Sequence, residues 1–173
     1  MRTRFAYPTV ITKDSFLNHQ YRVTKYNPDL ESYDEWTAIS DVGNSYSGIE
    51  FTLQEYEKVE SAYVEAVLSF MKAAEIESLT LTDFWNGFDY SDKELTLAEG
   101  KEFQDDSLKR VIQLILREEI GGQLTSKKGM FVHFGYDYYM YIGISNNYPE
   151  VISSIRSSGL YVESFKSPYL ESE

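Results

Sequence analysis

The sequence predicts an α+β fold: a single domain with a mostly antiparallel sheet and two main helices packed on one face. Three observations support this fold class. Short segments rich in β-branched and aromatic residues alternate with two longer segments of helical periodicity. Hairpins and crossovers of unequal length join them, which favours an antiparallel sheet. No internal repeat and no linker rich in Gly, Ser or Pro interrupts the chain, so residues 1–173 are expected to form one domain.

The first third of the chain predicts short strands. Residues 5–12 and 21–26 are rich in aromatic and β-branched residues, and Pro8 makes the first of them an edge or irregular strand. After a turn that begins at Asn27, residues 35–40 predict another short strand.

The clearest helix is predicted at residues 52–75, where Thr52 followed by Glu55 gives a capping-box pattern. Its apolar positions recur every three or four residues, as on one helical face: Tyr56, Val59, Tyr63, Val67, Phe70 and Ala74. Three glutamates fall on other faces and are expected to lie in solvent: Glu57, Glu60 and Glu65.

A strand and a long loop follow. Residues 78–85 alternate with a period of two and are rich in β-forming residues, which predicts a strand. Residues 86–106, the acidic loop, contain many more acidic than basic residues. Loops of this length inside a compact domain tend to be functional.

A second helix is predicted at residues 107–120, with Asp105 or Asp106 as its N-cap. Gly121 and Gly122 are expected to end it in a left-handed turn. These glycines follow a helix instead of preceding one, so they are interpreted as helix termination and not as a phosphate-binding loop. The apolar face of this helix is predicted from five residues: Leu108, Val111, Ile112, Ile115 and Leu116.

The aromatic run at residues 130–145, "MFVHFGYDYYMYIGIS", predicts a hairpin of two strands joined by a turn at 135–137. A short helix is predicted at 148–159, ended by Gly159, and a last strand at 160–167.

Several chemistries lack the residues they need. The chain has no cysteine, which excludes disulfides, thiolate zinc sites and a cysteine nucleophile and suits a reducing cytoplasm. His19 and His133 are its only histidines, and neither accompanies a G-x-S-x-G motif. The carboxylates at 89–94 lack the spacing of a calcium loop. We therefore expect no catalytic residues, no cofactor and no metal.

The N-terminal residues are followed by no apolar run of signal-peptide length, and no stretch approaches the roughly 18 to 20 apolar residues of a membrane span. A cytoplasmic protein without a membrane partner is expected. Its formal charge of −12 opposes binding to nucleic acid. This charge serves either solubility or recognition of a basic partner. The 15 tyrosines suit half-buried sheets and protein interfaces equally.

Three stretches carry a family resemblance: "REEI" at 117–120, "FVHFGYDYYMYIGI" at 131–144 and "GLYVESFKSPY" at 159–169. They resemble the C-terminal half of small acidic immunity proteins found beside bacterial polymorphic toxins, including contact-dependent growth inhibition systems. The resemblance covers about residues 108–170 and includes no catalytic motif. It implies a non-enzymatic cytoplasmic binder of a cognate toxin C-terminal domain, often a basic nuclease, whose active or substrate-binding surface it masks.

Under this hypothesis, two groups of residues are expected to contact the toxin. The acidic loop contributes Asp89, Asp92, Glu94, Glu99, Asp105 and Asp106, and the hairpin turn contributes Tyr136, Asp137 and Tyr138. Two alternatives remain open. One is a small-ligand or regulatory binding module that uses the tyrosine-rich sheet as a pocket wall. The other is a hydrolase that uses carboxylates and His133, with Asp137 near it in sequence.

Overall fold

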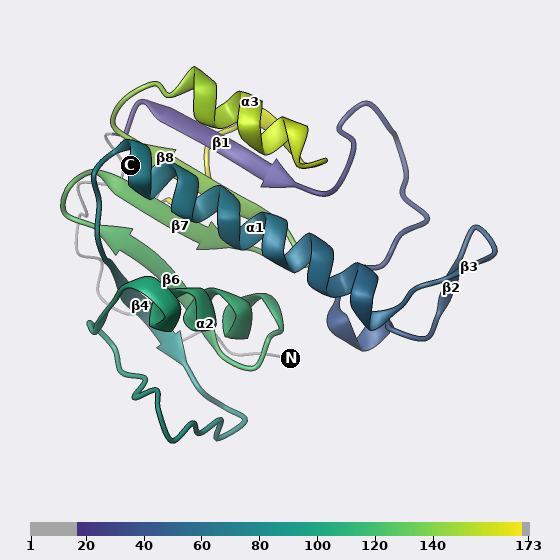
Figure 1. Ribbon diagram of the computed structural model, residues 1–173, viewed down its shortest axis with the longest axis horizontal. Coiled ribbons are helices and arrows are strands. Elements are labelled where there is room, and N and C mark those ends of the chain that lie inside the picture. Colours follow the sequence, from purple (N-terminus) through teal and green to yellow (C-terminus); the bar gives the residue numbers. More distant parts are fainter. Residues whose placement is uncertain (1–16, 171–173) are drawn as a thin grey trace.

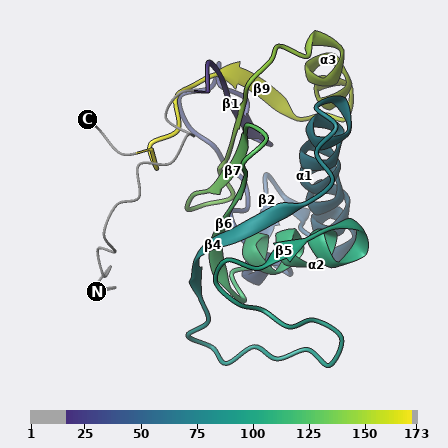
Figure 2. The ribbon, with the colours of Figure 1, turned by 90° about the vertical axis from the view of Figure 1, so that its left-hand side faces the viewer.

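The computed structural model describes residues 17–170, and it confirms the predicted α+β class. A seven-stranded sheet has the order β5-β4-β6-β7-β8-β1-β9, and neighbouring strands run antiparallel. Three helices cover one face of this sheet, as the side view in Figure 2 shows. A separate two-stranded hairpin projects beyond the N-terminal end of the longest helix (Figure 1).

The strands of the large sheet are β1 (His19–Thr24), β4 (Leu79–Trp85), β5 (Glu102–Phe103), β6 (Gly121–Ser126), β7 (Met130–Phe134), β8 (Met140–Ile144) and β9 (Tyr161–Ser164). The projecting hairpin consists of β2 (Ser45–Tyr46) and β3 (Ile49–Glu50). The helices are α1 (Leu53–Ala73), α2 (Asp105–Leu116) and α3 (Pro149–Ser157). None of the helices between residues 17 and 170 combines the length and the apolar character needed to cross a bilayer.

The core lies between the helices and the sheet. Strand residues that alternate toward the helices, such as Leu79, Leu81 and Val132, are fully buried. The predicted apolar face of α2 is confirmed, because all five of its residues are buried. The apolar face predicted for α1 is confirmed as well. Four of its residues are buried, Tyr56, Tyr63, Val67 and Phe70, and Val59 and Ala74 are partly buried at its margin.

Helix α1 begins as its sequence predicts, since the Thr52 hydroxyl accepts a hydrogen bond from the backbone N–H of Glu55 (3.2 Å). The prediction was wrong for Glu60, which is buried with 2% of its surface exposed. Its two carboxylate oxygens accept hydrogen bonds from Arg117, each at 2.7 Å. Because Arg117 follows the last residue of α2, the ion pair joins the two helices, a contact that spacing along one helix does not reveal.

The predicted strand at residues 35–40 is wrong. The chain forms a single 3-10 turn there, Ile39–Asp41. The side chain of Asp41 accepts hydrogen bonds from the backbone N–H groups of Thr37 (2.8 Å) and Ala38 (3.3 Å). Aspartate offers the backbone this local alternative to a strand ladder. The strand predicted at residues 5–12, with Pro8, lies outside the described residues.

The ends predicted for α2 were also wrong. Gln104 is the N-cap residue, and the helix ends at Leu116, with Glu118 providing the left-handed backbone (φ 59°) that we expected of glycine. Gly121 and Gly122 instead open strand β6, between β4 and β7. A Cβ at Gly122 would lie 2.6 Å from the side chain of Leu81, so close packing of the strand accounts for this glycine.

From Met130 onward, the elements agree with the prediction in type and order. The aromatic run forms the hairpin β7–β8, with its turn at residues 135–139. Helix α3 is followed by Gly159 at φ 95°, and β9 pairs with β1 at the edge of the sheet.

Candidate protein-docking surface

Three connections emerge at the same end of the sheet (Figure 1). Strand β4 ends at Trp85, opposite Gly121 at the start of β6. Continuing the β6–β7 register places residue 121 level with residue 135, where the β7–β8 turn begins. Two strand spacings, about 10 Å, therefore separate the loop after β4 from this turn. The chain from β1 to α1 leaves from this end too, because Val23 pairs with Met140.

Two segments at this end, residues 26–57 and 83–99, carry the net charge of the whole protein; we call them the acidic segments. The first contains eight carboxylates and no Lys or Arg, and the second contains five carboxylates and one lysine. The rest of the chain has 15 acidic and 15 basic residues and is formally neutral. The negative field is therefore strongly polarised toward one end of the molecule.

Within the second acidic segment, the four predicted contact residues divide into two kinds. Asp89 and Glu94 are exposed. Asp92 shapes the loop, since its side chain accepts hydrogen bonds from the Glu94 N–H (2.9 Å) and the Tyr90 hydroxyl (3.2 Å). The Glu94 N–H is the main cause of a lowered pKa of Asp92.

The fourth residue, Glu99, holds the outer edge of β4. Its carboxylate accepts hydrogen bonds from the consecutive N–H groups of Asp83 (3.2 Å) and Phe84 (2.8 Å). Strand β4 has a register irregularity between Thr82 and Trp85, and Asp83 adopts a positive φ of 51°. Such bulges redirect the side chains that follow them. Glu99 thus helps to set the direction of Trp85.

Asp105 and Asp106 lie elsewhere. They open α2 directly after β5, whose Phe103 pairs with Leu79, the first residue of β4. The seven-residue length of β4 therefore separates them from Trp85, about 20 Å. The structure does not bring these two aspartates together with the other predicted residues.

The hairpin turn presents two of its three predicted residues. Tyr136 is 59% exposed and Asp137 is exposed, whereas Tyr138 is only 5% exposed. The Tyr138 hydroxyl donates to the Tyr56 hydroxyl (3.0 Å) inside the core. Tyr138 is therefore a core residue whose side chain a partner cannot reach in this conformation, and we remove it from the contact set.

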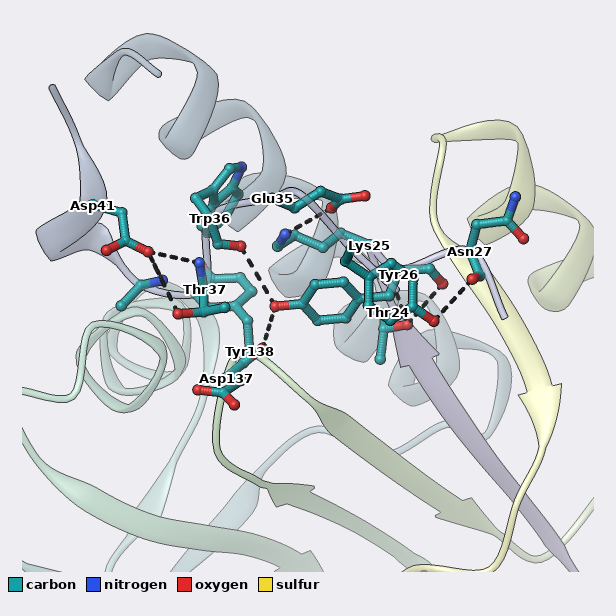
Figure 3. Close-up of polar contacts among 12 residues, drawn as sticks. Thr24, Lys25, Tyr26, Asn27, Glu35, Trp36, Thr37, Asp41, Asp137 and Tyr138 are labelled. Carbon is teal, nitrogen blue, oxygen red and sulfur yellow. Dashed lines mark hydrogen bonds and ion pairs between the residues drawn. The ribbon is translucent and has the colours of Figure 1, made fainter. Parts of the chain in front are cut away.

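This turn is strained and firmly held (Figure 3). Asp137 and Tyr138 both adopt positive φ (56° and 70°), which is costly for residues other than glycine. The Tyr26 hydroxyl donates to the carbonyl of Asp137 (2.5 Å), as Figure 3 shows. The Tyr63 hydroxyl donates to that of Tyr138 (2.9 Å). Burial raises the pKa of both donors, so they stay protonated at neutral pH. The tip of the turn is thus fixed before any partner arrives.

Lys25, the last cation before the first acidic segment, is folded inward. Its ammonium lies 2.9 Å from the Glu35 carboxylate and over the rings of Tyr26 (4.0 Å) and Trp36 (4.3 Å), as Figure 3 shows in part. Only 6% of its side chain is exposed, and burial lowers its pKa. Its positive charge offsets that of Glu35, one of the eight carboxylates of the first acidic segment.

Sequence reasoning missed the apolar side chains that lie among these carboxylates. Trp85 is 46% exposed and Phe88 is 63% exposed, and their rings meet edge to face with centroids 5.4 Å apart. In the first acidic segment Ile49, on the projecting hairpin, is 73% exposed. The motif "DFWNGFD", residues 83–89, holds the signal that could have been noticed, because it places three aromatics and a glycine between aspartates.

His133 has a structural setting. It is 7% exposed, its Nδ1 lies 2.8 Å from the Ser167 hydroxyl, and its ring stacks on Phe131 at 4.1 Å. Burial lowers its pKa to about 4, so the imidazole is neutral at pH 7. Ser167 in the C-terminal segment is thus the partner of His133, where the hydrolase hypothesis expected Asp137.

A hollow of about 390 Å³ lies at the other end of β1, beside α3. His19, Tyr21, Asn147 and Arg156 line it together with apolar residues. This hollow bears on the ligand-binding alternative, and it does not use the tyrosine-rich hairpin as a wall. Among residues 17–170, no three His, Asp or Glu side chains are grouped so that they could hold a metal ion.

Comparison of the chain with protein-family models, with curated proteins and with solved structures found no match.

Proposed function

We propose that this chain is an immunity protein that binds the C-terminal domain of a cognate bacterial toxin, a basic nuclease, inside the producing cell. It acts without catalysis or a cofactor, by covering the active or substrate-binding surface of the toxin. The observation that carries the proposal is the concentration of the entire net charge in two segments at one end of the molecule.

The chemistry of this surface fits a nuclease. A nuclease binds the phosphates of its substrate with basic side chains, and carboxylates on a rigid protein can occupy the same positions. Close charge pairs across such interfaces couple by about 1.5 to 7 kcal/mol, and opposite fields accelerate association. The exposed Tyr136 and Asp137 stand on a turn that is already held in place, which reduces the entropy lost on binding.

The direct test is growth protection. The C-terminal fragment of the protein encoded immediately upstream of this chain, here the toxin fragment, is expressed in bacteria with and without the chain, and survivors are counted. We expect the fragment to kill and this chain to restore growth. A control immunity protein of similar size and charge should give no protection. Toxicity that this chain cannot relieve, or a fragment without toxicity, contradicts the proposal.

The hollow beside α3 supports a second candidate function, a module that binds a small anion through Arg156 and His19. Mass spectrometry of the purified, denatured chain tests it. A ligand retained through purification and lost in an Arg156→Gln variant is expected if the module binds such a molecule, and a chain that is purified empty argues against this function.

A further inference from the structure

We propose that Trp85 and Phe88 form the anchor of the toxin interface, a rigid aromatic corner that receives a lysine or arginine side chain of the basic partner. The inference rests on the proposed function, because the partner in question is the toxin domain. It goes further by naming the residues that carry the binding energy and the chemistry that they recognise.

The rings of Trp85 and Phe88 lie at the protein surface. Trp85 and Phe88 are 46% and 63% exposed, although these side chain types normally bury their area in the core. They also contact each other, with ring centroids 5.4 Å apart at an angle of 84°. Two large rings in contact on the surface make a continuous apolar patch, and such patches mark interaction sites. Tryptophan is the residue type most often found at the energetic centre of interfaces.

The side chain of Trp85 is held in place by its neighbours. The indole of Trp85 lies directly over Gly87, where an added Cβ would be 2.0 Å from the ring atom Cζ2. Strand β6 also lies against this side chain, since a Cβ at Gly121 would be in ordinary contact with the Cβ of Trp85, at 3.5 Å. The backbone that directs this side chain is held by the Glu99 carboxylate. The ring is thus positioned in the free protein and loses little rotamer freedom on binding.

The negative charge around Trp85 and Phe88 favours a basic side chain of the partner. The pair stands between Asp83 and Asp89 in sequence, in a segment whose one cation is Lys93. Aromatic faces attract ammonium and guanidinium groups, tryptophan most strongly, and neighbouring carboxylates add to this attraction. A negatively charged or purely apolar partner surface would gain less from this arrangement. A basic protein surface therefore fits it best.

The test measures the affinity of purified chain variants for the toxin fragment by isothermal titration calorimetry. We expect Trp85→Ala and Phe88→Ala each to weaken binding by about thirty-fold, which corresponds to about 2 kcal/mol. The matched control is Tyr161→Ala, which removes a 38% exposed aromatic side chain from β9, outside the acidic segments, and should change the affinity less than about three-fold.

Three outcomes separate the inference from the proposed function. If the wild-type chain does not bind the fragment, the proposed function fails and the anchor with it. If it binds and both aromatic variants bind equally well, the anchor is overturned and the immunity function stands. If Tyr161→Ala weakens binding as much as the two aromatic variants do, the loss is not specific to Trp85 and Phe88 and this inference is wrong. Thermal unfolding of each variant shows whether the fold is intact.

A second measurement uses the two tryptophans, of which Trp36 packs in a ring cluster with Phe51 (4.6 Å) and Trp85 is the exposed one. In a Trp36→Phe variant, the remaining fluorescence comes from Trp85. Quenching by acrylamide, an uncharged quencher that the carboxylates do not repel, should be efficient in the free chain and fall several-fold when the toxin fragment binds. Unchanged quenching in the complex would mean that Trp85 stays in solvent, which overturns the anchor.

Discussion

Glutamates play opposite roles in two regions of the molecule: at the contact between helices α1 and α2, and in the acidic segments. In the interior, Glu60 is 2% exposed and both of its oxygens bind Arg117. In the acidic segments, Glu31 and Glu50 are exposed in a stretch of 32 residues without a Lys or Arg. A buried charge must be satisfied by a partner within the fold, whereas an exposed one leaves its field available to another molecule.

This difference indicates where stability and recognition lie. The interior network fixes the turn and the helices, so changes there should lower the free energy of unfolding. Changes in the acidic segments should leave that free energy nearly unaltered and alter association instead. The predictions below test this separation, from the largest expected change in stability to the smallest.

The largest effect is expected from Arg117→Met. The variant leaves the carboxylate of Glu60 buried without its bidentate partner, and breaking a buried ion pair costs about 3–5 kcal/mol. Urea unfolding followed by circular dichroism measures this loss. Glu57→Gln, an exposed site in the same helix, is the control and should change stability by less than about 0.5 kcal/mol. Equal effects of the two variants would mean that the interior pair does not stabilise the fold.

A smaller effect is expected from pH, through His133. Its pKa is about 4 in the folded chain and about 6.5 in an unfolded one. Because the unfolded state binds the proton more readily, this contribution to stability is fully present above about pH 6.5 and is lost as the pH falls toward 4. The loss is about 3 kcal/mol at most.

The measurement is urea unfolding at several pH values between 5 and 7, a window above the ordinary pKa range of most carboxylates. The control is His133→Asn, whose stability should depend less steeply on pH than that of the wild type. Parallel pH profiles for the two proteins would contradict the assignment of this dependence to His133.

Tyr138→Phe should have a moderate effect. It removes the hydroxyl that binds Tyr56 in the core while keeping the ring against Trp36 (5.1 Å) and Tyr63 (4.8 Å). One buried hydrogen bond contributes about 1 kcal/mol. Tyr161→Phe, at a partly exposed tyrosine, is the matched control and should be neutral within about 0.5 kcal/mol. If both substitutions prove neutral, the tyrosine network contributes packing alone.

The sequence predicted the elements that local pattern determines. Helical spacing located α1 and the buried face of α2, and alternation located β4 and the β7–β8 hairpin. The sequence did not predict β6, because two glycines after a helix resemble a helix end. Their role in the strand depends on the close packing of Gly122 against Leu81, which the sequence does not show. The burial of Glu60 was missed for a similar reason, since its partner Arg117 is 57 residues away.

The candidate site was predictable only in part. Acidic composition pointed to the loop after β4, and Asp89 and Glu94 are indeed exposed. Alternation along the hairpin could not decide which tyrosine faces the core. The turn places Asp137 and Tyr138 at positive φ, and this interrupts the alternation of side chains between the two faces of the sheet. The exposure of Trp85 depends on the irregularity in β4 and on Glu99, 14 residues further along the chain.

The smallest change in stability is expected from substitutions in the first acidic segment, which should instead slow association with the toxin fragment. The double variant Glu31→Gln, Glu50→Gln removes two exposed charges from the first acidic segment, and its free energy of unfolding should stay within about 0.5 kcal/mol of the wild type. Its association rate with the toxin fragment should nevertheless fall about ten-fold at low salt, because steering depends on the local field. Stopped-flow fluorescence measures this rate.

The control for that variant is Glu65→Gln, Glu75→Gln, which makes the same change in net charge at exposed sites outside the acidic segments. Its association rate should fall much less. At 1 M salt, where charges are screened beyond about 3 Å, the rates of all three proteins should converge. Equal losses in both double variants would show that net charge alone steers the partner, and the separation between a stabilising interior and a recognising end would then lose its electrostatic basis.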